Sequence, residues 1–178
     1  MIGVAVGLIA ASGASAAMAA VPGVTSEGTA PPKVKPAQIV YTGDGSGLFA
    51  GAQRVSKKNL GSIQWTKWNK KKALGSGANW LNDCKPNCAK GTYHGYAVTL
   101  KLTRPRHKSG FFVFTRMLVT YTGKLPKGVS TSRQTWTLVD HNKFFFWKFP
   151  SIRGADIRAP AHVRRCGQGP EPGDEHWR

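Results

Sequence analysis

The sequence predicts an all-β fold, a single antiparallel β-sandwich or small barrel with disordered termini. Two long segments alternate apolar and polar residues with the period of two that marks a half-buried strand. Shorter apolar runs are separated by glycine and proline, and no segment after residue 20 sustains a helical period. Short strands with this punctuation are typical of sandwiches and barrels.

The expected strands follow one another along the chain, with glycine-rich turns between the early ones. In order, they span residues 37–42, 60–68, 78–81, 92–103, 111–122, 134–139 and 143–149. The two long strands form a hairpin through a polar loop at residues 105–110. The last two strands form a hairpin around Asp140, His141 and Asn142, because Asp and Asn side chains favour turns.

The alternation in the long strands also predicts which side chains are buried. On the first long strand, the apolar face is formed by Tyr96, Val98, Leu100 and Leu102. The opposite face carries Ala97, Thr99 and Lys101. The apolar face of the second is formed by Val113, Met117, Val119 and Tyr121. Trp65 and Tyr96 both lie in the apolar phase, so we expect them in the core.

The N-terminal sequence predicts export. Residues 1–19 carry no charge, and an apolar run ends in the small-residue pattern Ala17-Met18-Ala19, which predicts a signal peptide cleaved near Ala19-Ala20. The alternative is an N-terminal helix packed on the domain. The run is too short to cross a bilayer, which takes about 20 apolar residues. We therefore expect a protein that is secreted or associated with the cell envelope, and not transmembrane.

The remainder divides by composition into three parts. Residues 20–36 are rich in Pro, Gly, Thr and Ala and read as a flexible linker. Residues 37–165 contain the strands and form one β domain, and residues 166–178 form a polar tail that we expect to be disordered.

The chain is strongly basic, with a net charge of +18 over 178 residues. Between residues 33 and 165 the only carboxylates are those of Asp44, Asp83, Asp140 and Asp156. Such a balance favours polyanions as partners: wall polymers, anionic lipid or non-specific nucleic acid. The alternative is that the charge only keeps an exported protein soluble. We expect a monomer with no cofactor and no metal.

The candidate polyanion-binding residues cluster in two places, after a Trp-x-x-Trp motif and after the first long strand. They are Lys67, Lys70, Lys71, Lys72, Arg104, Arg106 and Lys108. Aromatic residues beside lysines can grip single-stranded nucleic acids or sugars by stacking. The competing interpretation places Trp65 in the core and residues 70–72 in a solvated turn.

Cys84 and Cys88 flank a Lys-Pro-Asn turn, and cysteine pairs in exported proteins are normally oxidised. We expect a disulfide between them, with free thiols or a metal site as alternatives. His94 and Cys166 do not complete a known zinc spacing. Cys166 is left unpaired in the tail, free or bonded to another molecule.

Two further functions compete with binding. A small secreted hydrolase could use Asp83 and His94, because a catalytic imidazole needs an orienting carboxylate and a nucleophile. No serine lies in a nucleophile-elbow motif, and His94 could equally be a strand-end residue bonded to the backbone. A structural wall protein is the third possibility. The sequence therefore favours a binding protein over an enzyme without deciding between them.

Four motifs between residues 36 and 123 carry a resemblance. They are YTGDGSG at 41–47, IQWTKW at 63–68, NDCKPNCAKG followed by HGY at 82–96, and FTRM followed by YTG at 114–123. The Trp-x-x-Trp and Asn-Asp-Cys-x3-Cys-Ala-x-Gly patterns are the more specific. As a set they resemble a family of small secreted actinomycete proteins of unknown function. The resemblance implies export and a compact β domain, and it implies no activity, substrate or catalytic residue.

Overall fold

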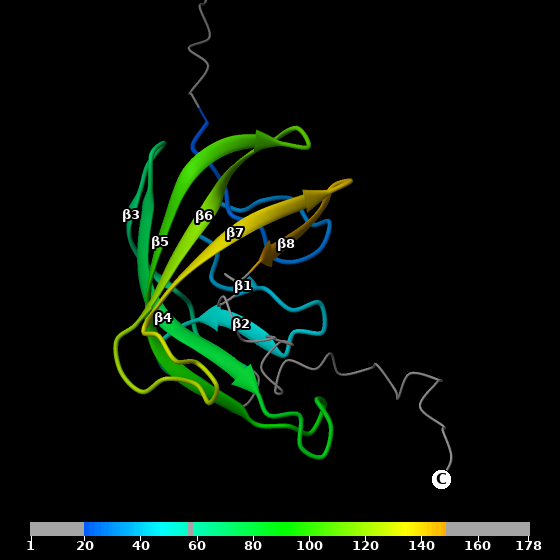
Figure 1. Ribbon diagram of the computed structural model, residues 1–178, viewed down its shortest axis with the longest axis vertical. Coiled ribbons are helices and arrows are strands. Elements are labelled where there is room, and N and C mark those ends of the chain that lie inside the picture. The colour runs from blue at the N-terminus through cyan, green and yellow to red at the C-terminus, as the bar shows by residue number, and fades with distance from the viewer. Residues whose placement is uncertain (1–19, 57–58, 149–178) are drawn as a thin grey trace, which may run out of the picture.

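The computed structural model describes residues 20–56 and 59–148 (Figure 1). These residues form eight β-strands and contain no helix, which confirms the all-β prediction. The strands are β1 (Ile39–Val40), β2 (Gly47–Ala50), β3 (Gln64–Trp68), β4 (Ala73–Asn82), β5 (Tyr93–Lys108), β6 (Phe111–Tyr121), β7 (Arg133–His141) and β8 (Phe144–Lys148). The expected signal peptide, the end of the β domain and the tail with Cys166 lie outside the described residues.

All the strands belong to one antiparallel sheet that curls into a half-barrel (Figure 1). Its order is β1-β2-β4-β5-β6-β7-β8, and β3 pairs with the first half of β4 while β2 pairs with the second half. Every strand pair is antiparallel. The sheet therefore has one concave and one convex face, and its two ends are β1 and β8.

Two local expectations were wrong. β2 was not expected, because its residues follow a glycine-rich run that reads as a turn. The expected polar loop at residues 105–110 is mostly strand: β5 continues to Lys108, and only Ser109 and Gly110 form the turn, with φ of 45° and 85°. Pairs of residues at positive φ match the twist of a tight hairpin, so the strands can pair up to the turn.

The concave face holds the main core. The predicted apolar residues of the two long strands are buried there: Val98, Leu100, Leu102, Val113, Met117, Val119 and Tyr121. Three aromatic rings from distant parts of the chain meet in this core, since Trp136 lies 4.8 Å from Tyr41 and 5.2 Å from Phe49 between ring centroids. Trp65 and Tyr96 are half-buried and pack against the same core. Buried side chains from β1, β2, β5, β6, β7 and β8 form this core together with Val24 of the N-terminal segment.

A chain of side-chain hydrogen bonds crosses the core. The Tyr41 hydroxyl donates to Asn79 Oδ1 at 2.6 Å, and Asn79 Nδ2 donates to the Tyr121 hydroxyl at 2.8 Å. Burial raises the pKa of both tyrosines. Asn79 therefore provides a hydrogen-bond partner in the core for both phenols.

The composition of the N-terminal segment, residues 20–36, predicted a flexible linker. In the structure this segment packs against the β domain instead. Val24 and Thr25 are buried, and Gly23 forms a bridge with Val113 of β6. Three tryptophan indoles donate hydrogen bonds to carbonyls of this segment: Trp68 to Pro22, Trp147 to Thr25 and Trp65 to Pro36. A sequence rich in Pro and Gly can be held this way because its backbone carbonyls still need partners.

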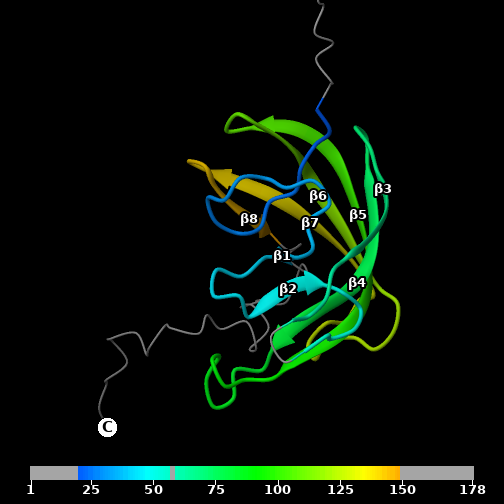
Figure 2. The ribbon, with the colours of Figure 1, turned by 180° about the vertical axis from the view of Figure 1, so that it is seen from behind.

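The same segment joins the two ends of the sheet. Val40 of β1 donates its N–H to Ser26 Oγ at 3.0 Å, and its carbonyl accepts from the N–H of Glu27 at 2.7 Å. Gly28 exchanges two backbone hydrogen bonds with Phe145 of β8, each 2.9 Å long. Figure 2 shows this segment on the concave side, beside β8 and β1. Residues 26–28 thus form hydrogen bonds to both end strands of the sheet.

Candidate functional site

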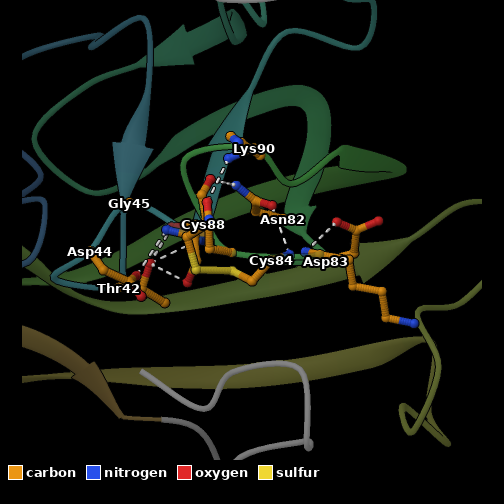
Figure 3. Close-up of a disulfide and its surroundings, with 12 residues drawn as sticks. Thr42, Asp44, Gly45, Asn82, Asp83, Cys84, Cys88 and Lys90 are labelled. Atoms are coloured by element: carbon orange, nitrogen blue, oxygen red, sulfur yellow. Dashed lines mark hydrogen bonds between the residues drawn. A yellow bond between two sulfur atoms is a disulfide. The ribbon is translucent and has the colours of Figure 1, made fainter. Parts of the chain in front are cut away.

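The most elaborate loop of the described chain joins β4 to β5, and the Cys84–Cys88 disulfide closes it (Figure 3). The disulfide prediction is confirmed. Asn82, at the end of β4, organises the loop: its Nδ2 donates to the carbonyl of Cys88 at 2.8 Å, and its Oδ1 accepts from the Cys84 N–H at 2.9 Å. Asn82 is almost wholly buried, so these bonds form in low-dielectric surroundings.

A second loop, residues 42–47, lies against the disulfide loop (Figure 3). Asn82 donates its N–H to the carbonyl of Ser46 at 2.8 Å, and the Tyr93 hydroxyl donates to the carbonyl of Gly45 at 2.7 Å. Asp44 Oδ1 accepts from the N–H of Ser46, the geometry of an Asx turn. The interpretation of this stretch as a glycine-rich turn agrees with these bonds.

Asp83 and His94 come together beside the disulfide loop. His94 Nε2 lies 3.1 Å from Asp83 Oδ2, and the imidazole side chain is 54% exposed. The other carboxylate oxygen accepts from the N–H groups of Thr92 at 2.8 Å and Lys85 at 3.2 Å. The Thr92 bond, followed by the His94 and Lys85 bonds, lowers the pKa of Asp83 to about 2.

The bonds of this pair tie the disulfide loop to the start of β5. A carboxylate can orient an imidazole as a general base, which activates either a water molecule or a nearby hydroxyl or thiol. Within residues 20–56 and 59–148, no hydroxyl or thiol is hydrogen-bonded to His94, and both loop cysteines are in the disulfide. In the same ranges no group of three or more His, Cys, Asp or Glu residues is placed to hold a metal.

The first cluster of predicted binding residues lies at the turn between β3 and β4. Asn69 builds this turn, because its Oδ1 accepts from the N–H groups of Lys71 and Lys72, both at 2.9 Å. The side chains of Lys67, Lys70 and Lys71 are exposed, and that of Lys72 is half-buried. The turn thus presents adjacent ammonium groups to solvent on a rigid hairpin.

The second cluster lies on the hairpin of β5 and β6. Arg104, Arg106 and Lys108 are exposed on β5. Arg104 has a φ of 54°, and its carbonyl accepts from the Thr115 hydroxyl at 2.7 Å. The hairpin continues past the pair Ala73–Leu102, where β4 begins directly after the turn that carries Lys70, Lys71 and Lys72. The register therefore places Arg104, the first residue of this cluster, at the end of the sheet that also carries the first cluster.

The Trp-x-x-Trp motif is part of the fold rather than an aromatic platform. Trp65 lies over Gly75, where an added Cβ would come within 2.6 Å of the indole ring. Trp65 and Trp68 meet edge to face with centroids 4.7 Å apart, and Trp68 also contacts Phe114. Their indole N–H groups donate hydrogen bonds to the N-terminal segment, and both side chains are half-buried.

The convex face of the sheet carries cations that the candidate set did not include. They alternate with the core residues of β5 to β8 and point away from them: Lys101, Arg116, Arg133 and Lys148. Lys101 was already placed opposite the core by the alternation of its strand. The others could be grouped with it only after the pairing of strands was known. No ion pair joins any of these cations, or the seven predicted ones, to a carboxylate within the described residues.

The described residues contain no helix long and apolar enough to cross a membrane. Comparison with known proteins finds no family model, no curated protein and no solved structure that matches this chain. We therefore infer a function from the chemistry of the surface and the loops.

Proposed function

We propose that this is an exported, basic β-domain protein that binds anionic polymers at or outside the cell envelope. The observation that carries the proposal is the separation of charge. The carboxylates of Asp44, Asp83 and Asp140 each accept hydrogen bonds within turns, whereas no lysine or arginine forms an ion pair with a carboxylate among the described residues. Such a surface attracts polyanions over distances of about a Debye length.

Two further features support export. Disulfides persist in oxidising compartments and are rare in reducing ones, and the Cys84–Cys88 bond closes the β4–β5 loop. The apolar residues before the described segment have the pattern of a signal peptide. Cleavage near Ala19-Ala20 would leave a mature chain that begins just before Pro22, the first residue of the N-terminal segment to be buried.

The test is binding of the mature protein to polyanions across a range of salt concentrations. Each neutralised phosphate releases counterions, so about five contacts to DNA weaken binding at least about a hundredfold between about 50 and 200 mM salt. A turn variant with Lys70→Glu, Lys71→Glu and Lys72→Glu should bind more weakly. Its control, with Lys85→Glu, Lys90→Glu and Lys127→Glu, has the same net charge but leaves the turn intact.

The outcomes separate three explanations. Weaker binding by the turn variant than by its control supports the proposal and places part of the site at the turn. Absence of binding to polyol phosphate polymer, nucleic acid and anionic vesicles at low salt would contradict the proposal and leave the charge with a solubilising role. The intact mass of protein recovered from the medium tests export separately, and full-length protein confined to the cytoplasm would contradict it.

A further inference from the structure

The register of the sheet arranges the convex-face cations in rows. One row runs across the strands through Lys67, Leu74, Lys101, Leu118 and Thr135. The next row on one side runs through Thr103, Arg116, Thr137 and Lys148. The next on the other side runs through Gln64, Ser76, Thr99, Thr120 and Arg133. We call these three rows the outer face.

The cations of the outer face are spaced along a path rather than gathered at a point. Lys101 and Arg116 are diagonal neighbours on paired strands, a relation that places Cα atoms about 7–8 Å apart. Lys67 and Lys101 share a row two strands apart, as do Arg116 and Lys148, which corresponds to roughly 10 Å at the usual strand spacing. Long, unpaired side chains at such intervals can follow successive charges of an extended polymer.

The residues between these cations supply hydroxyl groups. Each row contains at least one threonine, threonines alternate with cations in the row from Thr103 to Lys148, and no row contains a carboxylate. A threonine hydroxyl both donates and accepts, so it suits a ligand that offers phosphate oxygens and hydroxyl groups together. The apolar members, Leu74 and Leu118, are half-buried, so the outer face offers little apolar surface for insertion into a lipid layer.

The outer face also differs from the usual surface for single-stranded nucleic acids. Those surfaces combine cations with aromatic rings on which bases stack. The three rows contain no aromatic residue, and the nearby tryptophans of β3 are turned inward to hold the N-terminal segment. The chemistry therefore fits a polyanion whose units carry hydroxyl groups and no bases.

We propose that the outer face is the docking surface for a linear phosphodiester polymer of hydroxyl-rich units, such as a polyol phosphate. This inference rests on the proposed function and names both the surface and the class of polymer. The polymer lies across the strands, with its phosphates near Lys101, Arg116, Arg133 and Lys148 and its hydroxyl groups against the threonines. Lys67 connects the outer face to the lysine turn, which extends the track at the end of the sheet.

The experiment compares two variants of the mature protein that lose equal charge. The outer-face variant carries Lys101→Gln, Arg116→Gln, Arg133→Gln and Lys148→Gln. The loop control carries Lys85→Gln, Lys90→Gln, Lys124→Gln and Lys127→Gln, all exposed positions in loops outside the three rows. Binding to synthetic poly(glycerol phosphate) is measured as a function of salt, with single-stranded DNA of equal charge and anionic phospholipid vesicles as comparison probes. Circular dichroism and thermal unfolding check the fold.

We expect the outer-face variant to lose at least about tenfold in affinity at low salt, with a shallower salt dependence that reflects fewer released counterions. The loop control should stay within about twofold of the parent, apart from the general effect of charge. If the four-site variant folds poorly, Lys101→Gln and Arg133→Gln alone, both at exposed positions, should still weaken binding more than Lys85→Gln with Lys124→Gln.

Each contrary result has a distinct meaning. Equal losses in the two variants would overturn the outer face as the site while leaving polyanion binding in place. Tighter binding of DNA or vesicles than of the polyol phosphate would overturn the choice of polymer. If the parent protein binds none of the three probes, the proposed function itself fails, whatever the variants do.

Discussion

The two faces of the same strands differ in the polarity and the burial of their side chains. On β5, Val98, Leu100 and Leu102 are each at most 2% exposed, whereas Thr99 and Lys101 between them face solvent. On β6 and β7 the same alternation separates a core that includes Trp136 from outward threonines and arginines. Because successive side chains of a strand point to opposite faces, one segment can specify the fold and present a surface without compromise between the two.

The difference between the two faces indicates which residues can be substituted without disturbing the fold. Polar atoms on the concave side are bonded to particular partners, as Asn79 is to two tyrosines, so a change there disturbs several groups at once. The cations on the convex side have no partner among the described residues, so a change there alters the surface alone. The predictions below test this contrast by changing residues on either face, beginning with the largest expected effect.

The sharpest test of the contrast lies in two consecutive residues of β7. Trp136→Ala removes a wholly buried ring that packs against Tyr41 and Phe49, and should lower the free energy of unfolding by about 3–5 kcal/mol. Thr137→Ala, on the outer face, should change it by less than about 0.5 kcal/mol. Denaturant titration measures both. Similar losses in the two variants would show that the outer face also carries stability.

The second prediction concerns the buried polar chain. Asn79→Leu keeps the approximate volume but removes the hydrogen-bond partner that the hydroxyls of Tyr41 and Tyr121 share, and losing the partner of a buried polar group costs about 1–3 kcal/mol. We expect denaturant titration to show a loss of that order. The control is Tyr121→Phe, which should destabilise the parent more than it destabilises the Asn79→Leu protein. Additive losses would show that the bonds contribute little.

These same elements show which features of the fold can be predicted from the sequence. The faces of β5 and β6 were predictable because alternation is a local property of a strand. The hydrogen bonds from Trp65, Trp68 and Trp147 to the N-terminal segment were not, because the partners lie far apart in the chain and carbonyl acceptors leave no trace in composition. A segment rich in Pro and Gly therefore looks like a linker although it closes the sheet.

In the candidate site, too, some features can be predicted from the sequence and others depend on the pairing of strands. The disulfide was predictable because the two cysteines are four positions apart and flank a turn. The approach of His94 to Asp83 depends on the pairing of β4 with β5, which places His94 opposite Leu81. The rows of the outer face likewise needed the register, since only the pairing shows that Lys101 and Arg116 are diagonal neighbours.

The third prediction moves to an exposed carboxylate, where the effect should be smaller. Hydrogen bonds from Thr92, His94 and Lys85 depress the pKa of Asp83 from 3.8 to about 2 in the folded protein. The resulting stabilisation is present above the unfolded pKa and is lost as the pH falls from about 4 to about 2. Asp83→Asn should remove this part of the acid dependence. Identical losses of stability with falling pH in parent and variant would contradict the assignment.

The smallest effect is expected at a buried hydroxyl group of the N-terminal segment. Thr25 is buried, its carbonyl accepts from the Trp147 indole, and its hydroxyl oxygen has no hydrogen-bond partner among the described residues. Burying an unpaired hydroxyl is unfavourable, and valine has nearly the same shape without that group. Thr25→Val should therefore leave stability unchanged or raise it by up to about 1 kcal/mol. Thr25→Ala, which also removes the methyl group, should lower it, and denaturant titration of both distinguishes the two effects. A marked loss of stability in Thr25→Val would contradict this prediction, because it would mean that the Thr25 hydroxyl forms a stabilising hydrogen bond in solution.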